Sequence, residues 1–454
     1  MSYKINYNLK GGSGNANIIW NNNDDIVLNK NLANQTTAKI GIDYKYYTCK
    51  PLLDQFVCTN LDTKPDDGKV NKWAYDKVNL NWLNNGINGM TNCGNTCYFN
   101  SYMQCILFTY PLIYHIKLII QSNMGTNNIF EILVNRKFEN NDKIEMSTYI
   151  ARFATENAVS IGQQQDSMEY FKNFMNYLEK TFIIDNKTIL DKYFYETINY
   201  YPDNYIYYDP RKRGGIDNKM NLIKYYFEFL MTTEKNLSLL AQDSNKPDNI
   251  KTYTTDPFQD LQLNIYGSSL VDCLNEYFKE ESLLGDARIN LDSEYLGYEF
   301  DTNKIKFITL PKILCISLKR FKYDGVGKKI NTLVDIPYLI TKDMLLKYMW
   351  NNEDGYMNPL YDYDLYAFSY HIGDNDKSGH YASYINKPKF ENTQYNKFLP
   401  GWYRADDPSF TKVDNKSEID SQKNLGYIYF YKARDSDEDF HHHIGNKDIK
   451  FKYN

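Results

Sequence analysis

The chain has 454 residues, of which 42% are hydrophobic and 24% charged, values typical of a folded protein with a buried core. The formal net charge is −5 and the basic residues form no long block, so the sequence shows no electrostatic footprint for a nucleic acid. The first 20 residues lack the apolar segment of a secretory signal, and the most apolar stretch, residues 103–120, is too short and mixed to span a bilayer. These features predict an intracellular protein, cytoplasmic or nuclear, that inserts into no membrane.

The seven cysteines form no repeating framework, which argues against a disulfide scaffold and favours a reducing compartment. No C-x-x-C pair occurs, and the four-residue spacing of Cys93 and Cys97 is not the usual spacing of zinc ligands. Three consecutive histidines, His441 to His443, could bind a metal, although a solvated tail is the favoured interpretation. The sequence therefore predicts no metal site.

Residues 1–82 are polar and rich in asparagine, with short alternating runs such as the one from Ile40 that could form strands. We interpret them as an N-terminal extension of unknown role. A catalytic domain is expected over residues 83–435, followed by a charged C-terminal tail over residues 436–454.

Helical periodicity dominates the early part of the expected domain. Apolar residues recur every three or four positions after Cys97, on one face of a helix that Pro111 should end or redirect. A second helix is expected over residues 166–182. From about Leu261 onward β-rich runs take over, including the final run at residues 426–433. Helices early and strands late predict an α+β fold.

Cys97 stands out among the cysteines because it opens the first predicted helix after a polar, glycine-containing segment. A thiol at a helix N-terminus lies near the positive end of the helix dipole, which favours the nucleophilic thiolate. Asn92, five residues earlier, could offer an amide N–H to a developing oxyanion. Without a partner base, the alternative interpretation is a capped helix with a buried cysteine.

Two of the six histidines are candidates for the base. Three lie in the tail and a fourth in an apolar run, which leaves His371 and His380 on either side of a polar loop between two predicted strands. His380 is preferred because it follows Gly379 at the rim of this hairpin, and His371 is the runner-up. Asp406 and Asp407 could orient the imidazole, which gives the papain-like chain order Cys, His, Asp.

Six segments resemble the ubiquitin-specific protease family and occur in the family's order: residues 89–101, 163–171, 256–265, 310–321, 363–384 and 402–434. The resemblance implies that Cys97 is the nucleophile and His380 the general base. It implies that Asp406 orients the base, with Asp407 as the alternative, and that Asn92 contributes to the oxyanion site. The implied fold is a papain-like α+β domain with a helical thumb, a palm sheet and β fingers that grip ubiquitin.

The same resemblance assigns residues to the tail of ubiquitin, which carries arginines and ends in Gly-Gly. Asp166 and Glu169 lie one helical turn apart and could pair with arginines, with Gln165 nearby. Gly379 and Tyr381 would line the channel beside the scissile bond. Asp166 could also cap its helix, in addition to or instead of binding the tail.

Several family features differ in this chain. Many members carry two zinc-binding C-x-x-C pairs at the fingertips, whereas residues 236–255 and 284–306 contain no cysteine, so the fingers are expected to lack zinc. Met168 replaces a usual glutamine and Ala405 a common phenylalanine. Cys93 stands where the family often has an apolar residue.

The predicted activity is hydrolysis of the isopeptide or peptide bond after the C-terminal glycine of ubiquitin, through a Cys-His-Asp triad without a cofactor. The expected partners are ubiquitin and ubiquitinated proteins. One alternative is a catalytically silent ubiquitin-binding scaffold, disfavoured because every reactive position is filled. The other is a protease for a different ubiquitin-like modifier.

Overall fold

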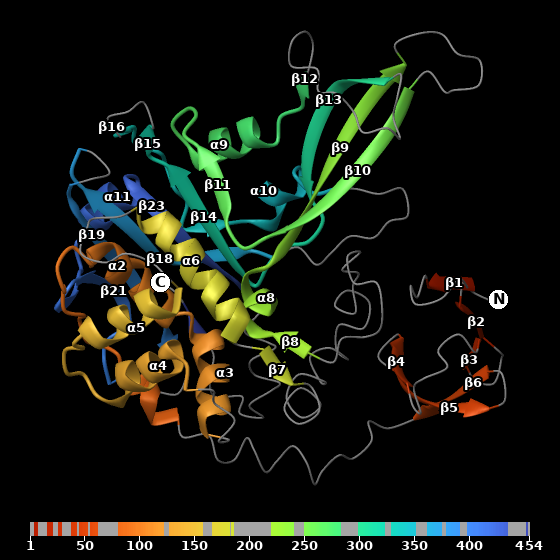
Figure 1. Ribbon diagram of the computed structural model, residues 1–454, viewed down its shortest axis with the longest axis horizontal. Coiled ribbons are helices and arrows are strands. Elements are labelled where there is room, and N and C mark those ends of the chain that lie inside the picture. The colour runs from red at the N-terminus through yellow and green to blue at the C-terminus, as the bar shows by residue number, and fades with distance from the viewer. Residues whose placement is uncertain are drawn as a thin grey trace. The chain divides into compact units, whose positions relative to one another are not determined.

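The computed structural model describes two compact units (Figure 1). The first comprises Met1–Val78, Ile183–Met220 and His442–Gly445, and the second comprises Asn79–Phe182, Asn221–His441 and Asn446–Asn454. Before residue 80 and after residue 434, the described residues are the strands named below. Between these limits the description omits residues 122–126, 158–165, 182, 186–218, 240–248, 283–297, 323–327, 351–360, 375–377 and 391–396.

The first unit contains a six-stranded antiparallel sheet with the strand order β1-β2-β3-β6-β5-β4. Its strands are β1 (Lys4–Tyr7), β2 (Ala16–Trp20), β3 (Ile26–Asn29), β4 (Ala38–Ile42), β5 (Lys45–Leu52) and β6 (Gln55–Leu61). The alternating run that starts at Ile40 therefore forms parts of two neighbouring strands, as its sequence pattern suggested.

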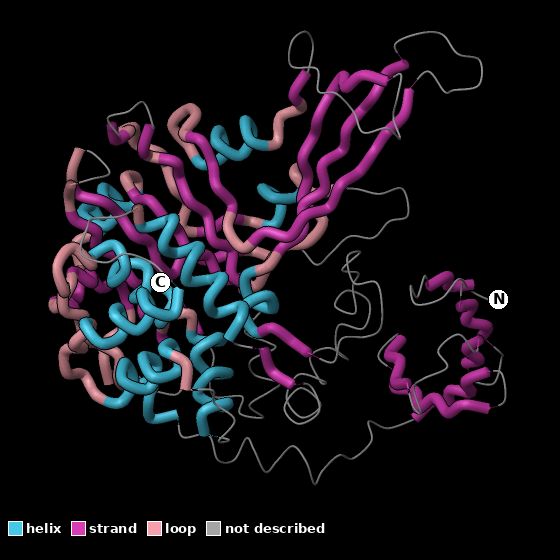
Figure 2. Tube along the Cα trace, in the orientation of Figure 1, coloured by secondary structure: helices cyan, strands magenta, loops and turns pink. Residues whose placement is uncertain are grey.

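Two helices of the second unit, α2 and α6, lie where their sequence patterns predict helices. Figure 2 shows helices and strands by colour, and the early elements are η2 (Leu80–Asn84), α2 (Cys97–Leu107), α3 (Tyr110–Gln121), α4 (Ile129–Glu139), α5 (Ser147–Asn157) and α6 (Ser167–Thr181). Pro111 lies in the first turn of α3, where its missing N–H costs nothing, so the chain changes direction between α2 and α3. Every residue of α2 is buried. No helix in the described part of the chain combines the length and apolar character needed to cross a membrane.

The palm is an eight-stranded sheet with the order β11-β14-β23-β18-β19-β21-β22, to which β17 adds by pairing with β18. Its strands are β11 (Leu261–Asn264), β14 (Ile313–Lys319), β17 (Leu339–Ile340), β18 (Tyr363–Ile372), β19 (His380–Lys387), β21 (Gly401–Asp406), β22 (Ser409–Lys412) and β23 (Gly426–Ala433). Helix α2 packs against β18, β19 and β21 and also against α6. The N-terminus of α2 and the adjacent strands β19 and β21 are thereby brought together.

The fingers are a four-stranded sheet with the order β10-β9-β13-β12, and Figure 1 shows its long strands projecting from the palm. The strands are β9 (Phe229–Leu239), β10 (Asn249–Phe258), β12 (Glu281–Ser282) and β13 (Tyr298–Phe307). Strand signals were predicted to take over from about Leu261 onward, and this boundary was placed too late, because β9 and β10 precede it. Both strands are rich in Thr, Asn and Lys and lack the clean apolar alternation that marks a half-buried strand.

The remaining elements are short: α8 (Leu222–Phe227), α9 (Leu270–Tyr277), α10 (Lys342–Leu346), α11 (Lys416–Lys423), β7 (Ile183–Asp185), β8 (Lys219–Asn221), β15 (Phe321–Lys322), β16 (Lys328–Lys329), β20 (Lys389–Phe390) and β24 (Phe451–Lys452). Arg320, 1% exposed, joins two nearby stretches of the chain, residues 330–332 and residues 424–426. Its guanidinium donates hydrogen bonds to the carbonyl oxygens of four residues: Gly426, Ile330, Thr332 and Asn424. Charge-assisted bonds of this kind are worth about 1.5–3 kcal/mol each, so Arg320 anchors β15 and β16 to the start of β23.

Candidate active site

The loop before α2 places Cys97 as the first residue of the helix, 3% exposed. Gly94 and Asn95 both have left-handed backbone torsions, with φ of 84° and 58°, which turn the chain sharply before the helix. Thr96 then stabilises the turn, because its backbone N–H donates to Asn92 Oδ1 (3.0 Å) and its hydroxyl accepts from the Cys93 N–H (2.9 Å). The thiol therefore lies at the positive, N-terminal end of the α2 dipole.

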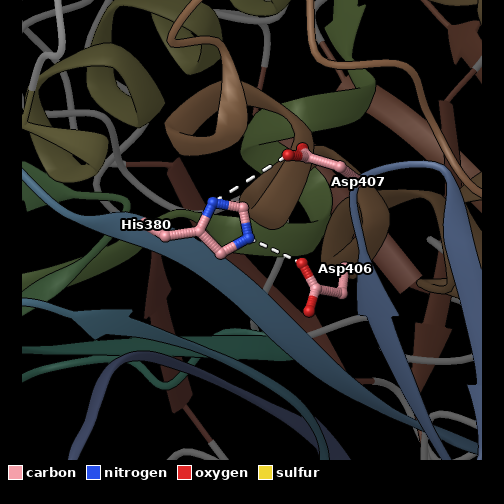
Figure 3. Close-up of side chains that lie close together, drawn as sticks. All are labelled: His380, Asp406 and Asp407. Carbon is pink, nitrogen blue, oxygen red and sulfur yellow. Dashed lines mark hydrogen bonds and ion pairs between the residues drawn. The ribbon is translucent and has the colours of Figure 1, made fainter.

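His380 opens β19 and makes a short side-chain contact with Asp406. Its Nε2 donates to Asp406 Oδ1 over 2.6 Å, and its Nδ1 lies 3.9 Å from Asp407 Oδ2 (Figure 3). The pKa of His380 is raised to about 10, first by the hydrogen bond to Asp406 and next by a hydrogen bond with Cys97. The ring therefore has a carboxylate as its hydrogen-bond partner and a thiol nearby, and its imidazolium form is stabilised.

Gly379 and His371 support the hairpin from which His380 projects. Gly379 has φ of 146°, and a Cβ at this position would lie 2.4 Å from His371 Nε2, so only glycine fits. His371 is 3% exposed and packs between the rings of Phe321 and Tyr381, with centroids 5.3 and 4.6 Å away. Burial lowers the pKa of His371 to about 4, so this ring is neutral at physiological pH.

The two neighbouring carboxylates have different partners. Asp406 ends β21, and while Oδ1 contacts His380, Oδ2 accepts from Arg404 Nη2 over 2.5 Å. The hydrogen bond from His380 is the main cause that lowers the pKa of Asp406. Asp407 follows with a left-handed φ of 47° and turns its carboxylate to the Cys97 loop, where it accepts from Asn92 Nδ2 (2.8 Å) and Asn100 Nδ2 (2.9 Å).

The same turn holds the loop through backbone contacts. The Met90 N–H donates to the Asp407 carbonyl over 2.7 Å. A Cβ on Gly89 would lie 2.1 Å from the Pro408 carbonyl, so the close approach of the two segments requires glycine. Asn92 was predicted as an oxyanion donor, and one N–H of its amide is engaged by Asp407. Its side chain is exposed beside the site, and the second amide N–H remains for a ligand.

The predicted tail-binding residues have unequal surroundings. Asp166 immediately precedes α6, and its Oδ1 accepts from the Met168 N–H over 2.6 Å, so the capping alternative describes a contact that is present. Both Asp166 oxygens also accept from the Tyr427 hydroxyl at 2.7 Å. Glu169, by contrast, is exposed. Gln165 lies outside the described residues.

Tyr381 and Tyr427 form an aromatic pair next to Asp166. Tyr381 is 1% exposed, and its ring lies 6.2 Å from that of Tyr427. Sequence reasoning missed Tyr427, because the chain contains 43 tyrosines and no local pattern distinguishes this one. The contact of Tyr427 with Asp166 is visible only in the tertiary structure, because Asp166 lies 261 positions earlier in the chain.

His380, Asp406 and Asp407 also form the one group among the described residues in which three metal-type ligand atoms lie within 4.8 Å of one another. The 2.6 Å hydrogen bond between His380 Nε2 and Asp406 already occupies one ring nitrogen, and Cys97 is near enough to raise the pKa of the ring. The arrangement is therefore suited to moving a proton between the thiol and the imidazole.

Comparisons with known proteins identify the family of the chain. A family model described as "Ubiquitin carboxyl-terminal hydrolase" matches residues 88–431. "Ubiquitin carboxyl-terminal hydrolase 48" of Gallus gallus is 25% identical over 354 residues, which cover 73% of this chain and 28% of the relative. "Ubiquitin carboxyl-terminal hydrolase 12" of Salmo salar is 25% identical over 367 residues, which cover 76% of this chain and 90% of the relative. This chain thus spans about a quarter of the first relative and most of the second.

A solved structure shares the fold. The SAGA module of Ubp8, Sgf11, Sus1 and Sgf73 bound to ubiquitin aldehyde contains a chain that matches with a TM-score of 0.55 and 18% identity, over 86% of this chain and 81% of that one. The likeness confirms the predicted α+β, papain-like architecture of thumb, palm and fingers. The family model covers about three quarters of the sequence. The chain belongs to the ubiquitin carboxyl-terminal hydrolase family, among the ubiquitin-specific proteases.

Proposed function

We propose that the protein is a deubiquitinating cysteine protease whose catalytic domain spans residues 83–435. The observation that carries this proposal is the His380 ring, which is hydrogen-bonded to the carboxylate of Asp406 and lies close enough to Cys97, at a helix N-terminus, for the thiol to raise its pKa. Such a constellation activates a thiol for attack on an acyl carbon. Its substrates are ubiquitin conjugates, in which the bond after the C-terminal glycine of ubiquitin is cleaved.

The reaction follows from the positions of the three side chains. The Cys97 thiolate attacks the carbonyl carbon of the terminal glycine, and the oxyanion that forms is stabilised by a free amide N–H of Asn92. The His380 imidazolium donates its proton to the departing lysine amine, which leaves a thioester on Cys97. His380 then takes a proton from water as the water attacks the thioester, and ubiquitin is released with a free carboxylate. The residues need no cofactor for these steps.

We assign Asp406 as the third member of the triad and Asp407 as a support for the Cys97 loop. Asp406 contacts His380 Nε2 at 2.6 Å, whereas Asp407 lies 3.9 Å from Nδ1 and accepts hydrogen bonds from two asparagines. A carboxylate on Nε2 leaves Nδ1 for the exchange of a proton with the thiol. Asp407 instead sets the position of Asn92.

The proposal is tested with ubiquitin that carries a thiol-reactive group at its C-terminus. We expect a covalent adduct with the wild-type protein, detected by its mass, and no adduct with Cys97→Ala. Cys93→Ser is the matched control, because Cys93 is an exposed thiol in the same loop and its loss should leave the adduct intact. Failure of the folded wild-type protein to form the adduct would overturn the proposal.

The same experiment separates the alternatives. A catalytically silent scaffold would bind ubiquitin without forming the adduct. A protease for another modifier would react faster with a probe built from that modifier than with the ubiquitin probe. The arginine-bearing tail of ubiquitin fits the acidic side chains at the start of α6, which favours ubiquitin.

Tail recognition makes a separate prediction at Glu169. Reversing its charge in Glu169→Lys should raise KM for a ubiquitin substrate about tenfold and leave kcat within about twofold, because one charge-assisted hydrogen bond to an arginine is lost. Glu169 is a cleaner test than Asp166, whose replacement would also remove the contacts with Met168 and Tyr427. Glu145→Lys is the control, because Glu145 is exposed and lies just before α5. An unchanged KM for Glu169→Lys would remove this residue from tail binding.

A further inference from the structure

The two oxygens of the Asp406 carboxylate are divided between two cationic groups. Oδ1 accepts from His380 Nε2 at 2.6 Å, and Oδ2 accepts from Arg404 Nη2 at 2.5 Å. Arg404 and Asp406 are two residues apart in β21, so their side chains project from the same face of the strand. Arg404 therefore reaches the triad carboxylate from within the same strand, independently of the Cys97 loop.

The guanidinium belongs to a residue whose partner in the palm register is Tyr384 of β19. The Arg404 side chain is 35% exposed, and the phenols of Tyr370 and Tyr384 lie close to it. Tyr370 is buried in β18, and the Tyr384 hydroxyl donates to Glu418 over 2.7 Å. Arg404 thus lies between the carboxylate of Asp406 and the tyrosines of the palm sheet.

A carboxylate with a single partner rotates readily, because the terminal torsion of an aspartate is broad and roughly two-fold. A second, charged bond on Oδ2 opposes this rotation, since turning the group would break a contact of the strong, charge-assisted class. The positive guanidinium also favours the ionised form of Asp406. Both effects keep Oδ1 on the imidazole while the proton moves between His380 and Cys97.

We infer that Arg404 is a positioning residue for the hydrolysis reaction, acting through Asp406 and not on the substrate. The inference rests on the proposed function, because it concerns the same triad. It predicts an effect on kcat with little effect on KM, since Arg404 makes its contact with the catalytic carboxylate and holds no part of ubiquitin.

The test compares Arg404→Gln with Arg404→Lys on a fluorogenic ubiquitin substrate. We expect Arg404→Gln to lower kcat about tenfold, with KM within about twofold, because small losses of alignment cost one to two orders of magnitude. Arg404→Lys keeps a positive donor and should recover most of the loss. Arg434→Gln is the matched control, because it removes a two-bond Arg434–Asp364 ion pair at the end of β23, with atoms 2.8 and 2.9 Å apart.

A double-mutant cycle separates positioning from a purely structural role. If Arg404 acts through Asp406, then adding Arg404→Gln to Asp406→Asn should cost less than about twofold, because the contact that it supports is already gone. A further tenfold loss in the Asp406→Asn background would overturn the inference. Unchanged kcat in Arg404→Gln, or equal losses in the Gln and Lys variants, would overturn it as well.

A second measurement does not depend on ubiquitin. The rate at which iodoacetamide alkylates Cys97 near neutral pH, followed on the peptide that contains it, reports the reactivity of the thiol beside the imidazole, and Cys93→Ser removes the exposed thiol of the same loop. Arg404→Gln should slow this alkylation several-fold, and Arg404→Lys should restore it. Equal rates in all three proteins would overturn the inference, whereas a wild-type protein that is alkylated rapidly yet cleaves no ubiquitin substrate would count against the proposed function alone.

Discussion

Replacing His380 by alanine is expected to lower kcat/KM for a ubiquitin substrate by about 10³- to 10⁴-fold, the usual contribution of a general acid–base group and nucleophile activator. The reason is geometric, since this ring contacts both Cys97 and Asp406. Its raised pKa of about 10 also keeps it protonated at neutral pH, where it can donate to the departing amine. Steady-state hydrolysis of a fluorogenic ubiquitin amide measures the loss.

His371 provides the matched comparison. Its pKa of about 4 leaves it neutral at pH 7, so it cannot donate the proton that the leaving amine needs. His371→Ala should keep kcat/KM within about tenfold, although its Tm should fall by several degrees because a ring packed against Phe321 and Tyr381 is removed. A severe loss of activity in His371→Ala, with activity retained in His380→Ala, would move the base to His371.

The second large effect is expected at Asp406. Asp406→Asn should lower kcat/KM by about 10²- to 10⁴-fold, because an amide can neither stabilise the imidazolium nor enforce the same tautomer. The pH dependence of kcat/KM should also change, in a direction that follows from the pKa of His380. The hydrogen bond to Asp406 is the largest cause of the raised pKa of His380, so removing the carboxylate should return that pKa toward its ordinary value near 6.5. The imidazolium is then lost at lower pH, and the alkaline limb of kcat/KM should move down from about pH 10 toward neutrality.

Asp407→Asn is the companion variant. Asparagine at position 407 can keep one of the two hydrogen bonds that the carboxylate accepts from Asn92 and Asn100, so we expect a loss of about tenfold. The alkaline limb should stay within about half a pH unit of the wild type, because Asp407 is not among the causes that raise the His380 pKa. Profiles measured from about pH 5 to beyond the alkaline limb near pH 10 compare the two variants. A larger shift in Asp407→Asn than in Asp406→Asn would make Asp407 the third member of the triad.

Much of the site could be predicted from the sequence because its components carry local signals. The spacing of apolar residues after Cys97 and the turn-forming residues before it predicted where α2 starts, and the alternation around His380 predicted a hairpin that the structure contains as β18 and β19. The helix expected over residues 166–182 is α6. These patterns depend on neighbours within a few residues, which is why a single sequence displays them.

The contacts between these components depended on the tertiary structure. Asp406 and Asp407 are adjacent in sequence and chemically identical, and they diverge because β21 ends at Asp406 while Asp407 takes a left-handed turn. That turn sends one carboxylate to His380 and the other to Asn92, 315 positions earlier. The hydrogen bond from the Tyr427 hydroxyl to Asp166 is a further long-range contact of this kind. By itself, the sequence determined which reactive groups the protein carries and on which elements they lie. The packing of α2 against the palm decided which of them meet, because side-chain partners hundreds of residues apart are set by strand register and turn geometry and not by local pattern.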